Sequence, residues 1–192
     1  MNIEIKKLTP DLVEDYIHFF DVTPHDDFVD EHKCYCVCWS SDDCDGMELS
    51  TVAKRRAKAY DYIKNGSIQG YLAYSDGKVV GWCNANDRAK CVKCVGFRYV
   101  LDFLSLDDEK VKSVFCFTIA PEMKRKGIAT ALLERVCQDA KDEGYNVVEA
   151  YPYHEKGNLS SDFGGYVNMY LKCGFKLYLD TNKGPVMRKY LK

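Results

Sequence analysis

The chain begins with a short alternation of apolar and polar residues that gives way to a helical pattern. In residues 2–8, Ile3 and Ile5 stand between polar neighbours, which is the period of a half-buried strand. Thr9 and Pro10 follow as an N-cap and a first-turn proline, so we expect a helix to begin there. The apolar residues that recur at helical spacing are Leu12, Val13, Tyr16, Ile17 and Phe20.

A second helix and a hairpin are expected next. Residues 47–64 are rich in Ala, Lys and Arg, and Gly66 offers a left-handed stop just after them. Residues 71–84 hold two apolar and aromatic runs around Asp76 and Gly77, which is the two-residue signal of a tight turn. The pattern therefore predicts a β-hairpin in the middle of the chain.

The second half starts with a segment, residues 87–112, whose pattern fits either a strand or a short helix. Residues 114–119 are a continuous β-prone run that ends before Pro121, as expected of a buried central strand. From Arg125 the apolar period becomes helical, and this helix is expected to stop at Gly144. The remaining elements expected are a strand at 147–151, a polar loop at 153–162, a short helix at 165–173 and strands at 175–179 and 186–190.

This order of elements predicts a mixed sheet with helices on its faces. A chain of 192 residues is long enough for one well-buried core. It has no repeat, low-complexity segment or linker, so we expect a single domain spanning residues 1–192.

Composition and charge exclude several classes of protein. Hydrophobic residues make up 46% and charged residues 29%, which is typical of a globular protein rather than a disordered one. The net charge of -2 gives no reason to expect binding to nucleic acid or to an anionic membrane. No apolar run reaches the length of a signal peptide or a membrane span, so we expect a cytoplasmic protein.

The chain has ten cysteines, most of which fall in two groups. These groups are Cys34, Cys36, Cys38 and Cys44, and Cys91 and Cys94. Zinc sites usually combine two Cys-x2-Cys pairs, and only the second group has that spacing. Alternate residues of a strand share a face, so the first group could simply line one face as small buried side chains. We expect no metal and mostly reduced thiols.

The segment most informative about chemistry is residues 119–130, where a buried strand passes through a basic turn into an amphipathic helix. The start of a helix exposes unpaired N–H groups and partial positive charge. Lys124, Arg125 and Lys126 add positive charge there, which opposes the helix dipole by about 0.3–1 kcal/mol each unless an anion binds. Gly127 lets a ligand approach the backbone. The segment is therefore either a phosphate cradle or an ordinary solvated basic turn.

Residues 124–129, Lys-Arg-Lys-Gly-Ile-Ala, resemble the Gln/Arg-x-x-Gly-x-Gly/Ala pyrophosphate loop of the GNAT superfamily of acetyl-CoA-dependent N-acetyltransferases. Residues 119–121 resemble the end of that family's fourth strand. Residues 169–175, Met-Tyr-Leu-Lys-Cys-Gly-Phe, are similar to its Leu-Tyr-x-x-x-Gly-Phe segment. The resemblance covers most of the chain from about Gly70 onward, with the hairpin at 71–84 as the second and third strands.

A GNAT-like fold implies a mixed, mostly antiparallel sheet of six to seven strands flanked by about four helices. It also implies acetyl-CoA as the acetyl donor, held mainly by main-chain groups, with the N–H near Ile119 polarising the acetyl carbonyl. One departure is Lys124, which replaces the family's Gln or Arg and lacks a planar fork. The residues that the resemblance assigns to the cofactor are Phe117, Thr118, Ile119, Lys124, Arg125, Lys126, Gly127, Ile128, Ala129 and Thr130.

Two residues are predicted to be catalytic. Tyr170 corresponds to the tyrosine that protonates the departing CoA thiolate in many relatives, and its alternative role is a packed aromatic. Glu149 is our candidate general base because a carboxylate in mid-strand is unusual, although a salt-bridged or solvent-facing role would also explain it. His154 is another candidate base, and Asn84 and Asn86 are candidate substrate contacts.

The function that we infer from the resemblance is transfer of an acetyl group from acetyl-CoA to a primary amine by direct attack in a ternary complex. The expected acceptor is a small molecule, with a protein amine as the alternative. A non-catalytic acyl-CoA-binding module and a cysteine-based metal or redox sensor are the competing hypotheses. Association into a homodimer is left open.

Overall fold

The protein, in a computed structural model that describes residues 2–25, 28–152 and 163–191, is built on a seven-stranded sheet. The strand order is β1-β2-β3-β4-β5-β7-β6, and every neighbouring pair is antiparallel except β4 and β5. The strands are β1 (Glu4–Lys7), β2 (Gly70–Ser75), β3 (Lys78–Asp87), β4 (Val111–Ile119), β5 (Val147–Ala150), β6 (Lys176–Thr181) and β7 (Gly184–Tyr190). The predicted mixed, mostly antiparallel sheet is confirmed.

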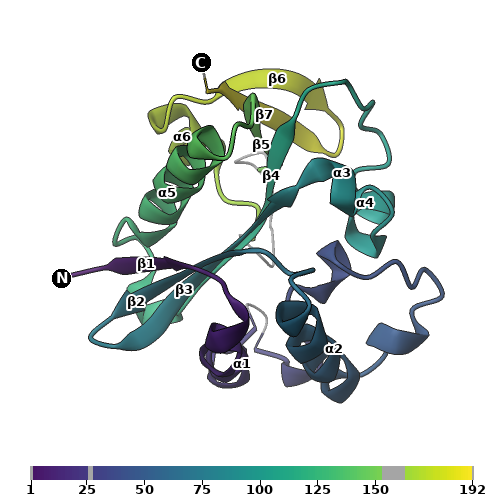
Figure 1. Cartoon of the computed structure of the whole chain (residues 1–192), viewed down its shortest axis with the longest axis vertical. Helices are drawn as coiled ribbons and strands as arrows, with labels where there is room; N and C mark the ends of the chain where they lie inside the picture. The colour runs from purple at the N-terminus through teal and green to yellow at the C-terminus, as the bar shows by residue number, and fades with distance from the viewer. Residues whose placement is uncertain (1, 26–27, 153–162, 192) are drawn as a thin grey trace.

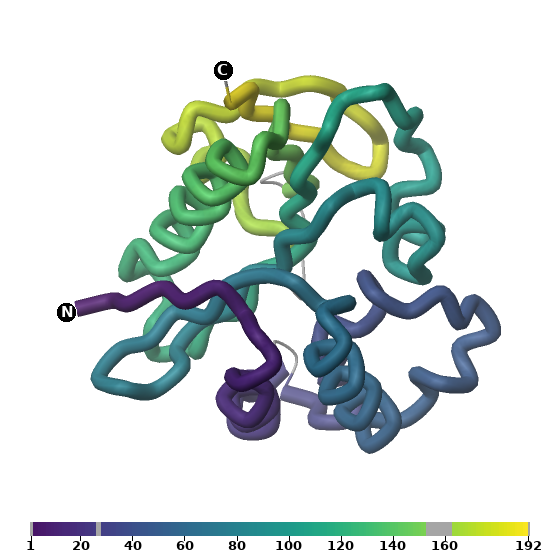
Figure 2. Tube along the Cα trace, viewed as in Figure 1, coloured from purple at the N-terminus to yellow at the C-terminus, as the bar shows by residue number. Residues whose placement is uncertain are grey.

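Helices cover both faces of this sheet (Figure 1). They are α1 (Val13–Val22), α2 (Val52–Lys64), α3 (Arg88–Cys91), α4 (Val95–Val100), α5 (Ile128–Asp142) and α6 (Val167–Lys172). One core cluster joins α5 and α6 to the sheet, and another joins α1 and α2 to the opposite face through β2 and β3. The path of the chain in Figure 2 runs from the edge strand β1 to β7, with the C-terminus beside β6.

The β2–β3 hairpin turns as its sequence predicts. Asp76 and Gly77 both have positive φ, at 50° and 76°, which is the backbone that a two-residue turn of this hand requires. The hairpin supplies the middle of the sheet and brings β3 alongside β4 from Gly81 to Asp87.

The feature that positions the functional site is a separation between β4 and β5. These parallel strands pair only from Val111 to Val114, opposite Val147 to Ala150. Beyond Val114, β4 continues to Ile119 while β5 has already ended. Among the residues that the structure describes, the last part of β4 therefore has a sheet neighbour on the β3 side only.

The ambiguous segment contains the short helices α3 and α4, so of the two alternatives left open for residues 97–100 the helix is the one that forms. Two other local predictions differ from the structure. The second long helix begins at Val52 rather than Met47, after Thr51 caps it by accepting from the N–H of Lys54. No strand forms around the first cysteine group, because Tyr35 and Cys36 both have left-handed backbone.

The expected loop at residues 153–162 and its candidate base His154 lie outside the described residues. Within the described part of the chain, no helix combines the length and the apolar character needed to cross a membrane.

Candidate active site

A cavity of about 770 Å³ opens where β4 ends, between the first turn of α5 and the start of α6. Eight of the ten residues that we assigned to the cofactor line it. They are Phe117, Ile119, Lys124, Arg125, Gly127, Ile128, Ala129 and Thr130. The structure therefore brings the end of the central strand, the basic turn and the helix start together around one space.

The two remaining residues point elsewhere. Thr118 does not line the cavity, because side chains alternate along a strand and its own lies on the other face of the sheet from those of Phe117 and Ile119. The ammonium group of Lys126 lies 3.7 Å from the sulfur of Met123 and is also absent from the lining.

The N-terminus of α5 lacks a side-chain cap. Its N-cap residue is Gly127, with φ of 84°, and the first intrahelical bond runs from the Ala131 N–H to the Gly127 carbonyl at 2.9 Å. The N–H groups of Ile128, Ala129 and Thr130 therefore precede the hydrogen-bonded part of the helix. Because these residues line the cavity, the helix start presents an anion with polar hydrogens and the positive end of the dipole.

The turn before this helix is held in an unusual backbone conformation. Arg125 has φ of 60°, which is uncommon for a residue with a side chain. A Cβ atom at Gly127 would meet nothing within 4 Å, so glycine is required there by its φ rather than by space. Two left-handed residues on either side of Lys126 thus give the turn its shape.

The start of α6 forms the opposite wall, which the sequence analysis missed. Asn168 and Lys172 line the cavity from one face of this helix, together with Tyr166 and Met169. Their spacing of four residues was a usable signal, because such residues share a helix face. Lys172 adds a third basic side chain to those of Lys124 and Arg125 around the cavity.

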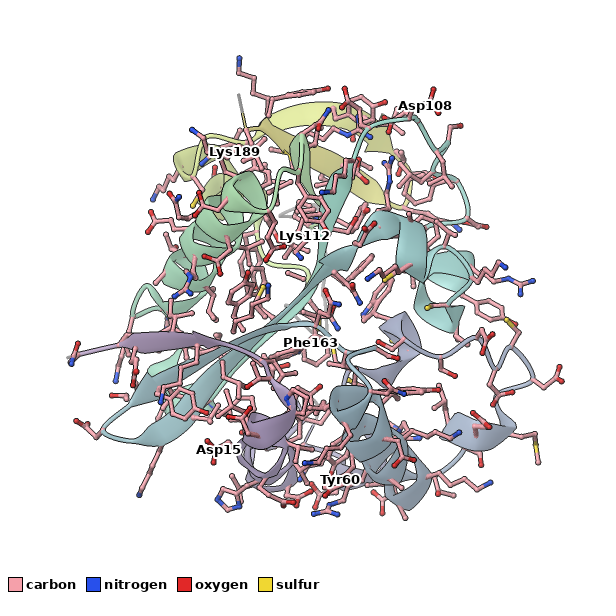
Figure 3. The ribbon with its side chains drawn as sticks, viewed as in Figure 1. Asp15, Tyr60, Asp108, Lys112, Phe163 and Lys189 are labelled. Carbon is pink, nitrogen blue, oxygen red and sulfur yellow. The ribbon has the colours of Figure 1, made fainter. Side chains whose placement is uncertain are left out.

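The free edge of β4 carries hydrogen-bond donors toward the cavity. The Ala120 N–H donates to the Val80 carbonyl at 3.0 Å, so the backbone N–H groups of the even-numbered residues at this end of β4 point toward β3. The backbone N–H groups of Phe117 and Ile119 point the other way. The Phe117 N–H donates to the carbonyl of Phe163 at 2.7 Å. Phe163, labelled near the centre of Figure 3, thus supplies a neighbour where β5 no longer does.

Tyr170 is buried and does not line the cavity, although its neighbour Met169 does. Its hydroxyl donates to the carbonyl of Gly164 at 2.9 Å, and its ring packs edge-on against Phe175 at 5.3 Å. Burial raises the pKa of Tyr170 well above its usual value, so the phenol keeps its proton at neutral pH. The carbonyls of two consecutive residues therefore accept hydrogen bonds: that of Phe163 from the Phe117 N–H of β4, and that of Gly164 from the Tyr170 hydroxyl.

Glu149 lies in a buried ion-pair network rather than at the cavity. Its carboxylate is 2.5 Å from Nε of Arg188 and 3.3 Å from Nη1 of Arg88, and it accepts from the hydroxyl of Tyr151 at 2.7 Å. Both arginines also bind Asp107, at 2.5 Å and 2.7 Å. This geometry favours a structural role for Glu149, and its role as general base stays a prediction.

The two asparagines proposed as substrate contacts are engaged within the protein. Nδ2 of Asn84 lies 3.4 Å from the sulfur of Cys36, and Nδ2 of Asn86 donates to the carbonyl of Ser67 at 2.9 Å. Neither lines the cavity at the end of β4.

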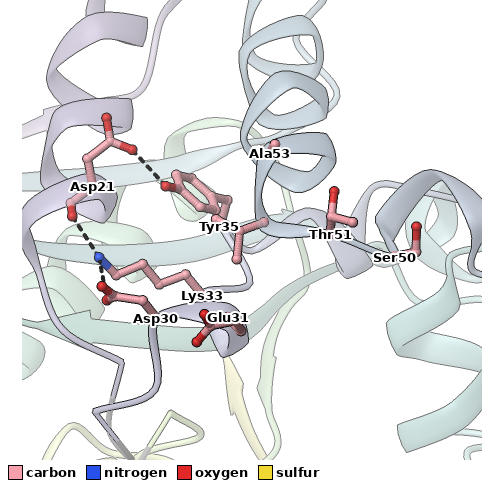
Figure 4. A pocket seen from close by; sticks show the side chains of 9 residues that line it. Asp21, Asp30, Glu31, Lys33, Tyr35, Ser50, Thr51 and Ala53 are labelled. Carbon is pink, nitrogen blue, oxygen red and sulfur yellow. Dashed lines mark hydrogen bonds and ion pairs between the residues drawn. The ribbon is translucent and has the colours of Figure 1, made fainter.

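A second cavity, of about 510 Å³, lies between the end of α1 and the start of α2 (Figure 4). Its acidic lining includes Asp21 and Asp30. Tyr35 and Arg56 bind the Asp21 carboxylate, at 2.6 Å and 3.0 Å. Lys33 lies 3.0 Å from Asp30. Side chains of the protein itself thus bind both of these carboxylates. In the described ranges, no cluster of three or more His, Cys, Asp or Glu side chains is arranged to hold a metal ion.

Comparisons with solved structures agree with the overall fold. The fold matches a PaiA N-acetyltransferase from Thermoplasma acidophilum, solved with coenzyme A, at 16% identity over 99% of both chains with a TM-score of 0.56. It also matches a putative GNAT acetyltransferase from Desulfovibrio desulfuricans, at 11% identity over the whole of both chains with a TM-score of 0.60. An N-acetyltransferase from Staphylococcus aureus Mu50 matches at 15% identity over the whole of both chains, with a TM-score of 0.54.

No curated protein sequence gives a significant match to this chain. The sequence profile of the acetyltransferase (GNAT) family, in contrast, matches residues 6–175, which is most of the chain. That range contains the central strands, the basic turn, α5 and α6. The chain therefore belongs to the GNAT family of acetyl-CoA-dependent acetyltransferases.

Proposed function

We propose that this acetyltransferase moves the acetyl group of acetyl-CoA to the primary amine of a small molecule, by direct attack within a ternary complex. The observation that carries the proposal is the continuity of the cavity at the end of β4. It joins an uncapped helix start, a group of basic side chains and the end of β4 at Phe117 and Ile119. These are the parts needed to hold a pyrophosphate and an acylated thiol in line.

The pyrophosphate is proposed to bind at the first turn of α5. The N–H groups of Ile128, Ala129 and Thr130 supply donors, and Lys124 and Arg125 supply charge from the preceding turn. Lys172 faces the same cavity from α6 and can contact a phosphate from the opposite side. Thr130 can add its hydroxyl.

The pantetheine arm is proposed to run along the free edge of β4. Its amides would pair with the strand as a neighbouring β-strand does, and the N–H of Phe117 or Ile119 would then donate to the acetyl carbonyl. The carbonyl of Phe163 accepts a hydrogen bond from the Phe117 N–H on this edge. Binding therefore requires the segment formed by Phe163 and Gly164 to move away from β4.

The same movement would release the proposed acid. Tyr170 now donates to the carbonyl of Gly164, so displacing that residue frees the hydroxyl to face the thioester sulfur. The amine nitrogen attacks the carbonyl carbon, and the C–S bond breaks as the tetrahedral intermediate collapses. The sulfur takes the proton of the Tyr170 hydroxyl, and the proton lost by the attacking amine restores the phenol through solvent.

A small acceptor is favoured over a protein amine by the charge of the chain. The net charge of -2 is too small to create the acidic surface that would attract a lysine-rich protein segment. In addition, Tyr35, Arg56 and Lys33 already occupy the Asp21 and Asp30 carboxylates of the α1–α2 cavity.

A transfer assay tests the proposal directly. The purified protein is incubated with acetyl-CoA and either a panel of small primary amines or lysine-containing peptides, and the release of free CoA thiol is followed. We expect amine-dependent release with at least one small amine and slower release with the peptides. Release with peptides alone would replace the small acceptor by a protein amine.

Binding without turnover is distinguished by a thermal melt in the same samples. Acetyl-CoA at a hundredfold excess over its dissociation constant should stabilise the fold by about 2.7 kcal/mol. A stabilised protein that transfers to none of the acceptors would support the non-catalytic binding module instead. No stabilisation at all would contradict both functions.

A further inference from the structure

The second cysteine group lies at a cavity that the proposed acetyl transfer does not use. Cys91 ends α3 and Cys94 directly precedes α4. Both thiols line a cavity of about 290 Å³ whose other walls include Trp39, Asn86 and Lys90. Most of its lining is polar, and the cavity borders the two cysteines although these are only 1% and 5% exposed.

The backbone holds these two cysteines at a distance that suits a disulfide. The Cys94 N–H donates to the Cys91 carbonyl at 2.9 Å, which closes a four-residue turn. Such a turn keeps its first and last Cα atoms within about 7 Å. Disulfides need Cα separations of roughly 4.4–6.8 Å. All ten cysteines are free thiols in this structure, so the pair is present in its reduced form.

The two thiols differ in chemical character. A hydrogen bond with Cys91 lowers the pKa of the Cys94 thiol, whose sulfur also lies 3.9 Å from the Lys90 carbonyl. The same hydrogen bond, with burial, raises the pKa of Cys91. A thiol with a lowered pKa has a larger thiolate fraction and attacks disulfides first, while its neighbour completes the exchange.

Other cysteines of the chain lack this combination. Cys137 is buried against the sheet by α5, and burial raises its thiol pKa to about 12. Cys83 is buried in the middle of β3, and burial raises its pKa as well. Neither lines any of the cavities described above.

We propose that Cys91 and Cys94 form a redox-active dithiol that exchanges with low-molecular-weight disulfides entering the cavity beside Trp39. The Cys94 thiolate attacks one sulfur of the disulfide RSSR, forming a mixed disulfide and releasing RS⁻. Cys91 then loses its proton, attacks the Cys94 sulfur and releases the second RS⁻. The protein dithiol is oxidised by two electrons to a disulfide, and RSSR is reduced to two thiols.

This site is mechanically connected to the free edge of β4. α4 packs so closely on Trp39 that a Cβ atom at Gly96 would lie 2.7 Å from the Trp39 ring. Trp39 stacks on Phe115 with ring centroids 4.5 Å apart. Phe115 belongs to β4, two residues before Phe117. The turn between α3 and α4 is thus linked through Trp39 and Phe115 to the strand that is proposed to hold the acetyl group.

The experiment maps the cysteines of the full, reduced chain after exposure to hydroxyethyl disulfide, a probe small enough for this cavity. Remaining thiols are alkylated under denaturing conditions and the peptides are analysed by mass spectrometry. We expect a Cys91–Cys94 linkage, with the loss of two titratable thiols and recovery of both on reduction with dithiothreitol. The matched control, Cys137→Ser, should form the same linkage.

Two variants test the assigned order of attack. Cys91→Ser removes the second thiol, so the reaction should stop at a hydroxyethyl adduct on Cys94. Cys94→Ser should give neither linkage nor adduct. A wild-type chain without the Cys91–Cys94 linkage would overturn the proposal, whether or not the variants fold. An adduct on Cys91 in Cys94→Ser, with none on Cys94 in Cys91→Ser, would overturn the assignment of Cys94 as the attacking thiol.

Discussion

Arg125 shows how a single residue can serve a ligand at the expense of its own backbone. It has left-handed φ without being glycine, and it lines the cavity at the end of β4. Left-handed backbone costs a residue with a side chain about 1–2 kcal/mol. Residues held in such conformations cluster at functional sites, where the surrounding structure maintains them. The strain and the charge of Arg125 can be separated by mutation.

Replacing Arg125 by glycine removes the guanidinium group and relieves the left-handed strain at the same time. We expect the melting temperature without ligand to stay the same or rise, because the relief offsets the greater freedom of glycine in the unfolded chain. The extra stability given by acetyl-CoA should fall, since one phosphate contact is lost. Thermal melts with and without acetyl-CoA measure both effects.

Gly127→Ala is the matched control for this change. Space is open at that position, so its cost should come only from φ, at about 1–2 kcal/mol without ligand. An Arg125→Gly variant that keeps the full acetyl-CoA shift would mean that this side chain does not contact the cofactor.

Tyr170→Phe isolates one hydroxyl group. The ring and its packing on Phe175 are kept, while the hydrogen bond to the Gly164 carbonyl is lost at a cost of about 0.5–1.5 kcal/mol in stability. If the hydroxyl protonates the CoA sulfur, kcat should fall by about 10²–10⁴-fold with little change in acetyl-CoA affinity. Steady-state kinetics and calorimetry measure these quantities.

Tyr166→Phe is the control for a hydroxyl near the same cavity that has no assigned chemical role. A Tyr170→Phe variant with the wild-type kcat would assign Tyr170 to packing alone.

At the scale of elements, the decisive relation is between β4 and the residues that lead into α6. Phe163 and Gly164 take hydrogen bonds from β4 and from Tyr170, and the Phe163 ring packs on His25 at 5.4 Å. The segment is therefore held at both its backbone and its side chain. Its departure is a step in the proposed binding of acetyl-CoA.

Phe163→Ala should make that departure easier. It removes the ring contacts while leaving the backbone carbonyl in place, so a larger fraction of the protein is ready to bind. Apparent affinity rises in proportion to that fraction, and we expect acetyl-CoA to bind severalfold more tightly. Isothermal titration calorimetry gives the dissociation constant.

Phe28→Ala, at a phenylalanine that is 78% exposed, is the control for the loss of a ring. Equal affinities for wild type and Phe163→Ala would show that the ring does not hold the segment on β4.

At the scale of the whole molecule, a buried charge network ties together elements that are distant in sequence. Arg88 of α3, Glu149 of β5 and Arg188 of β7 meet in the interior, and Asp107 joins both arginines from the chain before β4. Arg88, Glu149 and Arg188 are each at most 3% exposed. Breaking one partner of such a network leaves charges without compensation.

Glu149→Gln keeps the shape of the side chain and removes its charge. We expect a loss of about 3–5 kcal/mol in the free energy of unfolding, because two buried guanidinium groups lose their shared carboxylate. Urea denaturation measures the loss, and turnover should be compared per folded molecule at a temperature where the variant is folded. Normal stability together with a large fall in kcat would instead identify Glu149 as the general base.

The sequence predicted the elements that depend on local pattern and missed the relations that depend on packing. The hairpin at Asp76 and Gly77, the long helix α5 and the basic turn followed from periodicity and turn residues. The burial of Glu149 against Arg88 and Arg188 did not, because its partners lie on strands and helices far along the chain. A mid-strand carboxylate has the same pattern whether it faces substrate or an ion pair.

The same limit applies to the candidate site. Positions in the pyrophosphate turn could be named from their motif, since backbone groups in a helix start are placed by the helix itself. Thr118 was predicted to bind the cofactor with its neighbours and stays a prediction, although it does not line the cavity, because a motif does not show which face of a strand each side chain lies on. The contact of Phe163 with β4 left no sequence signal, as it is made through a main-chain carbonyl.

That carbonyl has a consequence for the catalytic cycle. A segment joined to the protein acts as a tethered competitor for the cofactor, and short flexible tethers give effective concentrations in the millimolar range. In the proposed binding mode every acetyl-CoA molecule would have to outcompete it, which would raise KM, and it would replace every CoA molecule that starts to leave. Where product release limits the rate, such a competitor raises kcat. The Phe163 and Gly164 carbonyls would thus weaken the binding of acetyl-CoA and speed the release of CoA.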